Sequence, residues 1–177
     1  MIHIEIIQEF APLFVQGVLM SLRIGLFSCI LGIFLGTISG MILAGSSKIL
    51  KFFVSVYVTI IRGTPMLIQI STTYFVLMYL GVSISAMTSA IISIGLNSGA
   101  YLSQIVLSGI KSVNKGQIEA AKVLGFSSSQ TMRLIILPQA IRTMIPAFGN
   151  ELVTLVKDSS LASTIGVYGL SKQGQIV

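Results

Sequence analysis

Long runs of apolar residues, separated by short polar stretches, set the pattern of this chain. The runs cover about residues 11–44, 49–80, 85–110 and 138–156. A helix needs ~20 residues to cross the ~30 Å hydrocarbon core of a bilayer, so each run is about long enough to span it. The pattern therefore predicts an all-α integral membrane protein with about four membrane helices, in a single transmembrane domain over residues 1–177.

Composition and charge fit this class and add an orientation. Hydrophobic residues make up 54% of the chain, and Lys and Arg number 11 against 5 Asp and Glu. Because the basic residues lie in short loops beside apolar runs, they indicate membrane orientation rather than nucleic-acid binding. If the runs alternate in direction, one side holds Lys48, Lys51, Lys111, Lys115, Lys122 and Arg133. The positive-inside rule then predicts an amino terminus outside and residues 111–137 in the cytoplasm.

The second apolar run is interrupted by Arg62, Gly63, Thr64 and Pro65. Proline removes a backbone donor and disfavours helix in the residue before it, so a structural break is expected here. Broken backbone at membrane depth is tolerated only inside protein or beside a water-filled cavity. A solute pathway or a subunit interface is one interpretation. A plain kink, with Arg62 held by neighbouring carbonyls, is the other.

Polar residues form a stripe along the third run. They recur at four-residue intervals, at Ser85, Ser89, Ser93, Asn97 and Tyr101. A helix that is polar along one stripe turns that stripe toward protein or water, so these residues either line a path or hydrogen-bond to other helices.

The outer half of the fourth run is also polar. Glu151 follows Pro138 by 13 positions, which places it ~20 Å along a helix. An ionisable residue at that depth is expensive, so it either contacts a solute or forms a salt bridge, with Lys157 or Arg62 as partner. The substrate-path candidates are Asn97, Tyr101, Asn150, Glu151, Thr154, Lys157 and Ser159.

Between these runs, residues 111–137 form a polar island. Gly125 is placed to end one short helix, and Ser127 with Gln130 reads as a capping box that begins another. This is a helix-turn-helix in outline, yet both flanks enter the membrane within a few residues. A groove-reading DNA-binding domain has no room there, and we expect a docking surface for a partner protein instead.

This island resembles the EAA loop of ABC-transporter permeases. The matching positions are Glu119, Ala120, Ala121, Gly125, Ile135, Leu137 and Pro138. Other stretches resemble the polar amino-acid permeases, the importers of histidine, arginine and glutamine: residues 62–65 with Gln69, 116–117, 137–140 and 157–161. The similarity covers nearly the whole chain, which is identified as a member of that family.

The resemblance implies a type I importer, in which two permease chains, identical or related, form the path through a bacterial inner membrane. Each EAA loop would dock on a cytoplasmic ATP-binding cassette ATPase, and an extracytoplasmic amino-acid-binding protein would deliver the solute. The residues expected to couple to the ATPase are Gly116, Glu119, Ala120, Ala121, Gly125, Leu137 and Pro138. No G-x-x-x-x-G-K-[ST] phosphate loop occurs in the chain, so ATP and Mg are expected on the ATPase, and the chain is expected to be no enzyme and to bind no cofactor.

Family members with cationic substrates receive them on a membrane-embedded acidic residue, and Glu151 matches by position. The resemblance therefore favours a polar, basic amino acid as substrate, and a neutral polar amino acid, whose own ammonium group would also meet Glu151, is the alternative. Family members normally have five membrane helices, so a further carboxy-terminal helix is expected to be missing here. A stand-alone secondary transporter or channel is the alternative. A membrane-embedded hydrolase is disfavoured, because the sole histidine is His3 and no metal-ligand spacing occurs.

Overall fold

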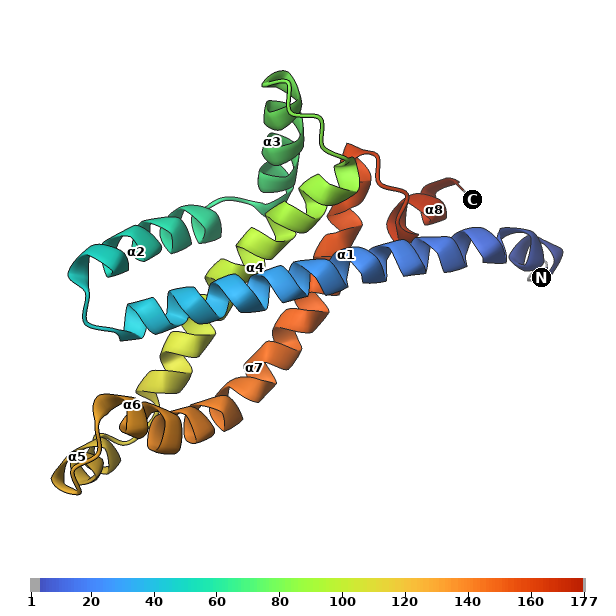
Figure 1. The fold of residues 1–177 in the computed structure, drawn as a ribbon. Coiled ribbons are helices and arrows are strands. Elements are labelled where there is room, and N and C mark those ends of the chain that lie inside the picture. Colours follow the sequence, from blue (N-terminus) through green and yellow to red (C-terminus); the bar gives the residue numbers. More distant parts are fainter. Residues whose placement is uncertain (1–3, 177) are drawn as a thin grey trace.

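A computed structural model of the protein describes residues 4–176 and places most of them in helices (Figure 1). His3 lies outside the described residues. In chain order the segments are α1 (Ile4–Ala44), α2 (Lys48–Gly63), α3 (Met66–Tyr79), α4 (Ala86–Lys111), α5 (Lys115–Val123), α6 (Ser128–Thr131), the π-helix η1 (Met132–Ile136), α7 (Leu137–Asp158), the 3-10 helix η2 (Ser159–Ile165) and α8 (Leu170–Ile176).

Helix α4 is the centre of the molecule, because α1, α2, α3, α7 and η2 all pack against it. Its closest neighbour is α1, and the two backbones approach at small residues. A Cβ added to Gly36 would lie 2.5 Å from the Cβ of Leu102, closer than real Cβ atoms come. Gly32, Gly36 and Gly40 recur at four-residue spacing along α1, and each meets α4. Small residues at such a crossing let helices gain packing energy in lipid.

The second apolar run is split into α2 and α3, whose axes differ by 104°. Helix α2 ends at Gly63, and Pro65 stands at the N-cap position of α3. The Thr64 hydroxyl donates 2.8 Å to the carbonyl of Ile60, one turn back. The bend thus occurs at the four residues where the sequence predicts a break.

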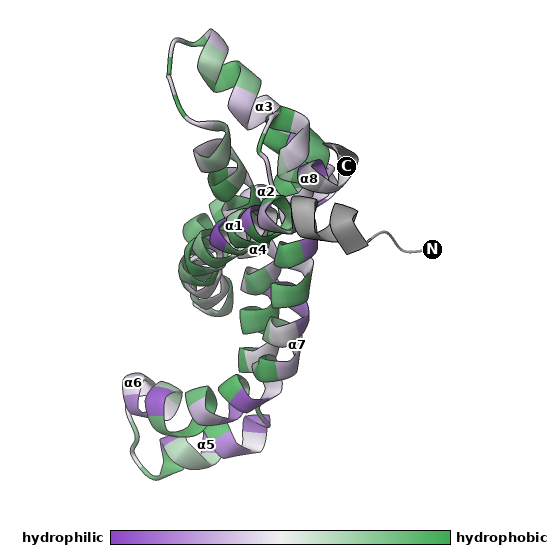
Figure 2. Ribbon diagram, turned by 90° about the vertical axis from the view of Figure 1, so that its right-hand side faces the viewer, coloured by the Kyte–Doolittle hydropathy of each residue, from purple (hydrophilic) through white to green (hydrophobic). Residues whose placement is uncertain are grey.

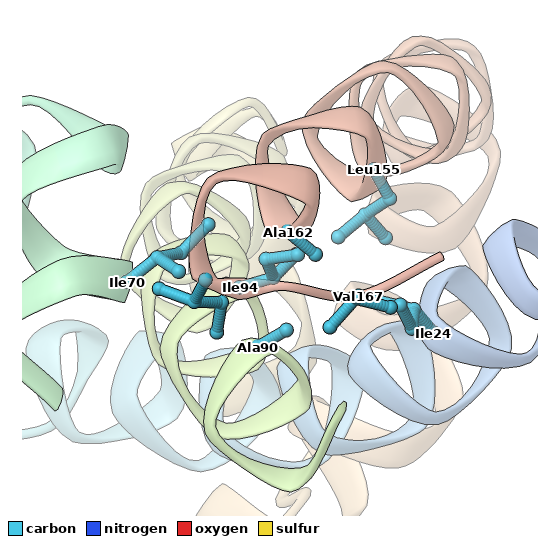
Figure 3. Close-up of a cluster of buried hydrophobic side chains, with 8 residues drawn as sticks. Ile24, Ile70, Ala90, Ile94, Leu155, Ala162 and Val167 are labelled. Carbon is cyan, nitrogen blue, oxygen red and sulfur yellow. The ribbon is translucent and has the colours of Figure 1, made fainter. Parts of the chain in front are cut away.

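A cluster of buried apolar side chains packs several helices against one another (Figure 3). It brings Ile24 of α1, Ile70 of α3 and Ile94 of α4 against the carboxy-terminal part of the chain. From that part come Leu155, Ala162, Ile165 and Val167. This cluster fixes α3 and the outer end of α7 relative to α4.

Helices α1 and α4 are long and apolar enough to cross a membrane, and the bent α2–α3 pair qualifies as a third span (Figure 2). On this measure the described residues contain two membrane-crossing helices, or three if the bent pair is one span, against the four or so expected from the sequence. The remaining long helix is α7, with 22 residues. It falls short in apolar character because it carries Arg142, Glu151, Lys157 and Asp158.

Residues 112–136, between α4 and α7, form a short helical hairpin. Gly125 has a φ of +80°, a left-handed conformation that ends α5. The Ser127 side chain then accepts from the Gln130 amide, and the Gln130 side chain accepts from the Ser127 amide, which completes a capping box. Helix α6 continues through η1 into α7, so the hairpin is joined to a long helix without a flexible loop. The π-helical turn is not predicted by the sequence.

Candidate functional site

A cavity of 610 Å³ lies at the α2–α3 bend. Three parts of the chain line it. They contribute residues 62–66 at the bend, Asn97 and Tyr101 of α4, and Glu151, Thr154 and Asp158 of α7. Its volume falls within the ~300–1,000 Å³ typical of small-molecule sites. The bend and the substrate-path candidates of two other helices therefore meet at one cavity.

The polar stripe of α4 divides into two parts with different surroundings. Ser89 and Ser93 are buried at 0% and 2% exposure, and the Ser93 hydroxyl donates to the Ser89 carbonyl. Asn97 and Tyr101, one and two turns further along, line the cavity. The hydrogen bond of Ser93 stays within α4, so the first half of the stripe is buried without bonding to another helix. Asn97 both lines the cavity and bonds to Gln69 of α3, so the two interpretations meet in the second half.

Gln69 joins the bend to α4. Its side-chain nitrogen donates to the carbonyls of Ile61 and Thr64, both at 2.8 Å. Its side-chain oxygen accepts from the Asn97 amide at 3.3 Å. A broken helix leaves the carbonyls at its end short of helical donors, and Gln69 of α3 donates to two carbonyls at the end of α2. Gln69 therefore holds the wall of the cavity in place.

The charged groups of the cavity are one guanidinium and two carboxylates. Arg62 lies over the ring of Tyr101, 4.8 Å from its centroid, in a cation–π contact. Glu151, Thr154 and Asp158 recur at spacings of three and four, so one face of α7 turns both carboxylates toward the cavity. The arrangement places a surplus of negative charge next to an aromatic face.

Three substrate-path candidates lie outside the lining of this cavity. Asn150 and Lys157 are exposed on α7, beside the face that carries Glu151. Ser159 is buried at 2% exposure, and its hydroxyl donates 2.7 Å to the Val156 carbonyl. These residues were predicted as substrate-path candidates because they are polar. Their positions in the helical turns, however, place them away from the face that carries Glu151.

Sequence reasoning did not select Gln69, Met66 or Asp158 as site residues. The signal for Asp158 was available, since it lies seven positions after Glu151 and therefore on the same helical face. Met66 lines the cavity only because α3 begins there at the bend. The contacts of Gln69 depend on the 104° angle, which no local pattern specifies.

A second concave surface lies on the helical hairpin, with a volume of 330 Å³. It is bordered by Ala120, Ala121 and Leu124 on one side and by Ile135 and Pro138 on the other. Gln139 bridges the two sides, donating to the Gln117 side chain and, at 2.9 Å, to the Ile135 carbonyl. Several of the residues expected to couple to an ATPase therefore border one groove.

Several apolar side chains around this groove are exposed. Val123 is 88% exposed, Leu124 75% and Leu134 61%. Glu119 and Gly116 are exposed on the same short helix, and the Gly116 amide donates to the Asn114 side chain that caps it. Exposed apolar side chains with polar neighbours are typical of a surface that binds another protein.

Residues 11–175 match the family described as the binding-protein-dependent transport system inner membrane component. The chain belongs to this family. Members are inner-membrane permease subunits of ABC importers, and this chain is such a subunit, with relatives that act on amino acids. ABC importers of this kind work with an ATPase and a substrate-binding protein. The stand-alone secondary transporter finds no support in these comparisons.

Several relatives of this permease have names that specify a substrate. A putative glutamine transport system permease protein GlnP of Rickettsia bellii is 38% identical over 98% of this chain and 81% of its own. The L-cystine transport system permease protein TcyB of Bacillus subtilis is 37% identical over 95% of this chain and 72% of its own.

Solved structures of permeases give the same fold. The crystal structure of an amino acid ABC transporter with histidines matches with a TM-score of 0.92 and 35% identity, over 99% of this chain and 82% of that one. The MetNI methionine ABC transporter, in an inward-facing conformation, matches at 0.78 and 26% identity over 90% of this chain and 77% of that one. The all-α fold of a type I importer permease is therefore confirmed.

Proposed function

We propose that this permease subunit forms the translocation path for a polar, basic amino acid, and that the cavity at the α2–α3 bend is where the solute binds within the membrane. In this proposal Glu151, with Asp158, receives the cationic groups of the solute. Asn97, Tyr101 and Thr154 contact its polar and apolar parts.

The observation that carries the proposal is the balance of charge around the cavity. Its lining holds one cation, Arg62, against two carboxylates, Glu151 and Asp158. A basic amino acid carries two positive groups and one carboxylate, which is the complement of that set. A neutral amino acid would leave one carboxylate without a partner, which is costly away from bulk water.

The bend offers a place for the carboxylate of the solute. Helix α3 begins at Met66 on the cavity wall, and the first amides of a helix have no partner within it. The positive end of a broken membrane helix favours an anionic group, and Arg62 stands beside it. An amino acid would therefore lie with its carboxylate at the bend and its ammonium groups toward α7.

Coupling to ATP hydrolysis is assigned to the helical hairpin, with ATP and Mg bound by the separate ATPase subunits. Gly116, Glu119, Ala120, Ala121, Gly125, Leu137 and Pro138 are the residues proposed to act there. The exposed apolar side chains of α5 favour a protein partner, and the rigid junction through η1 favours transmission of its movement into α7. The chain itself would carry out no catalysis.

The proposed assembly contains two permease subunits, identical or related, two ATPase subunits and an extracytoplasmic amino-acid-binding protein. Its orientation follows from charge: the amino terminus outside and the hairpin in the cytoplasm. The α1–α2 turn and the hairpin lie toward one end of the molecule and the α3–α4 turn toward the other, which is compatible with that orientation (Figure 1).

Uptake competition in the reconstituted complex tests the substrate class. Radiolabelled arginine uptake, driven by ATP, should be inhibited by lysine and histidine more strongly than by glutamine or cystine. If glutamine were taken up well and the basic amino acids neither entered nor competed, the assignment of a basic substrate would be wrong while the chain remained a permease.

A further inference from the structure

The two arms of the helical hairpin are joined to α7 in different ways. The second arm, α6, runs through η1 into α7 without a break. The first arm, α5, is joined by a side chain: the amide nitrogen of Gln139, in the first turn of α7, donates to the Gln117 side chain of α5. The same nitrogen donates to the Ile135 carbonyl at 2.9 Å. An amide nitrogen has two hydrogens, so the donor capacity of Gln139 is fully used.

The π-helical turn η1 brings Gln139 to this position. The Leu137 amide donates to the Met132 carbonyl, five residues back, and Pro138 has no amide hydrogen with which to continue an α-helical pattern. A π turn takes one residue more than an α turn, so it rotates the helix that follows by about 100°. Without this rotation the Gln139 side chain would leave the side of α7 that faces α5.

The start of α7 is packed closely on the end of α4. Ala140 is fully buried, at 0% exposure. A Cβ added to Gly109 of α4 would overlap Met144 of α7 and lie 3.2 Å from the Ala140 carbonyl oxygen. Because such packing leaves no room for α7 to slide on α4, a force on Gln139 acts on both helices. Further along the same helix, Glu151 lines the cavity at the α2–α3 bend.

We propose that Gln139 and Gln117 are positioning residues that lock α5 to the start of α7, so that a displacement of α5 by the ATPase moves α7 with it as one body. This inference rests on the proposed function, because it takes the hairpin as the surface on which the ATPase docks. It adds a connection through side chains to the backbone connection through η1.

The backbone alone would not transmit such a displacement well. Helix α5 is joined to α4 and to α6 by two short turns, residues 112–114 and 124–127, and the second contains Gly125 at a φ of +80°. Rotation at these turns would absorb part of the movement of α5. The glutamine pair lies near the start of α5, at the end remote from Gly125, and therefore closes the hairpin where the backbone leaves it open.

Substitutions at the two glutamines separate the hydrogen bond from the shape of the side chains. Gln139→Leu removes the donor, and Gln117→Leu removes the acceptor. Gln117→Glu is the matched control, because a carboxylate still accepts from the Gln139 amide. The double variant, with leucine at both positions, shows whether the two residues act through one interaction, since its effect should then equal that of either single change.

The measurement is the amount of amino acid taken up per ATP hydrolysed, in proteoliposomes that hold the assembled complex with its loaded binding protein. Radiolabelled arginine and glutamine are both offered, so the result does not depend on the substrate class. We expect the ratio to fall about fivefold for Gln139→Leu and Gln117→Leu, the factor that corresponds to one neutral hydrogen bond. Gln117→Glu should keep the native ratio, and the ATPase should copurify with every variant.

A covalent link should restore the coupling. The chain has one cysteine, Cys29, which Cys29→Ser removes. Gln117→Cys and Gln139→Cys are then introduced together and joined by a short bifunctional maleimide. We expect a low ratio before the reaction and a return toward the native ratio after it. The Cys29→Ser complex, treated in the same way, controls for effects of the reagent on the partner subunits.

A native ratio in the Gln139→Leu and Gln117→Leu complexes would overturn the proposal. So would a cross-link that stops uptake, because α5 would then have to move relative to α7. Loss of the ATPase from the leucine variants would also overturn it, since the glutamines would then serve docking and not transmission. Failure of the proposed docking surface has its own signature: Leu124→Ser, on the exposed side of the hairpin, would leave copurification of the ATPase unchanged.

Discussion

The side-chain amide of Asn97 donates a 3.3 Å hydrogen bond to Gln69 of α3, and Gln69 in turn donates to the carbonyls of Ile61 and Thr64 at the end of α2. One side chain thereby connects the bend to the central helix. The cavity wall formed by residues 62–66 takes its position relative to α4 through this link. The break is thus a supported structure, in which carbonyls at the end of α2 have a side-chain donor.

Replacing Gln69 with leucine should destabilise the protein by about 1–3 kcal/mol, because the Thr64 carbonyl loses its side-chain donor and the Ile61 carbonyl keeps only the Thr64 amide. The midpoint of thermal unfolding of the detergent-solubilised complex measures this. Thr72→Leu, at an exposed position of the same helix, is the matched control and should change the midpoint little. Equal midpoints for the two variants would show that Gln69 does not support the bend.

Helix α1 should be intolerant of a side chain at Gly36, where it crosses α4, and tolerant of one at Gly25, which faces α7. Gly36→Ala places a Cβ 2.5 Å from the Cβ of Leu102, whereas Gly25→Ala has its nearest neighbour at 3.9 Å. Overpacking of this kind costs about 1–3 kcal/mol. The yield of folded protein and its unfolding midpoint should fall for Gly36→Ala and hold for Gly25→Ala. An unchanged unfolding midpoint for Gly36→Ala would mean that the crossing is looser than described.

The joint of the helical hairpin should be sensitive to any side chain that disfavours the left-handed region. Gly125 has a φ of +80°, so Gly125→Asp and Gly125→Ala add about 1 kcal/mol or more of strain, and asparagine adds less. We expect Gly125→Asp to abolish the stimulation of ATPase activity by substrate while membrane insertion is retained. Gly149→Ala, with open space around it in α7, is the control. Full stimulation of ATPase activity by substrate in Gly125→Asp would show that this residue takes no part in coupling.

Docking of the ATPase should depend on the exposed apolar residues of α5. Leu124 borders the groove and is 75% exposed, so Leu124→Ser changes little within this chain. We expect it to weaken copurification of the ATPase subunit about 10-fold, as a buried leucine contributes ~2 kcal/mol to an interface. Tyr168 is 58% exposed and is predicted to lie on the opposite side of the membrane from the hairpin. Tyr168→Ser should therefore not affect copurification. An unchanged ATPase yield with Leu124→Ser would place the docking surface elsewhere.

Local chemistry explains which features could be predicted from the sequence. Proline at position 65 predicts a break, Gly125 a helix end, and Ser127 with Gln130 a capping box, because each acts within one helical turn. The four-residue spacing of the α4 stripe predicts a polar face, yet it does not distinguish the buried Ser93 from the cavity-lining Asn97. That distinction depends on which helices cover each half of α4.

The features that escaped prediction arise from tertiary packing. The contacts of Gln69 require a particular angle between α2 and α3, and the π-helical turn of residues 132–136 requires the hairpin to be joined to α7 in a fixed register. Lys157 and Asn150 shared the polarity of the site but lie beside its face, and Asp158 lies on it. Counting which residues share a helical face with Glu151 would have selected Asp158.

Glu151 is the residue on which the assignment of a basic substrate depends most. Concentration-dependent uptake of arginine, lysine and glutamine by the reconstituted complex should be compared between the native chain and Glu151→Gln. We predict that Glu151→Gln raises the KM for arginine and lysine by about 10-fold or more, since a charged hydrogen bond contributes ~1.5–3 kcal/mol, while the KM for any glutamine uptake changes little. Unchanged arginine and lysine uptake in Glu151→Gln would contradict the role of this carboxylate as the receiver of the substrate's charge.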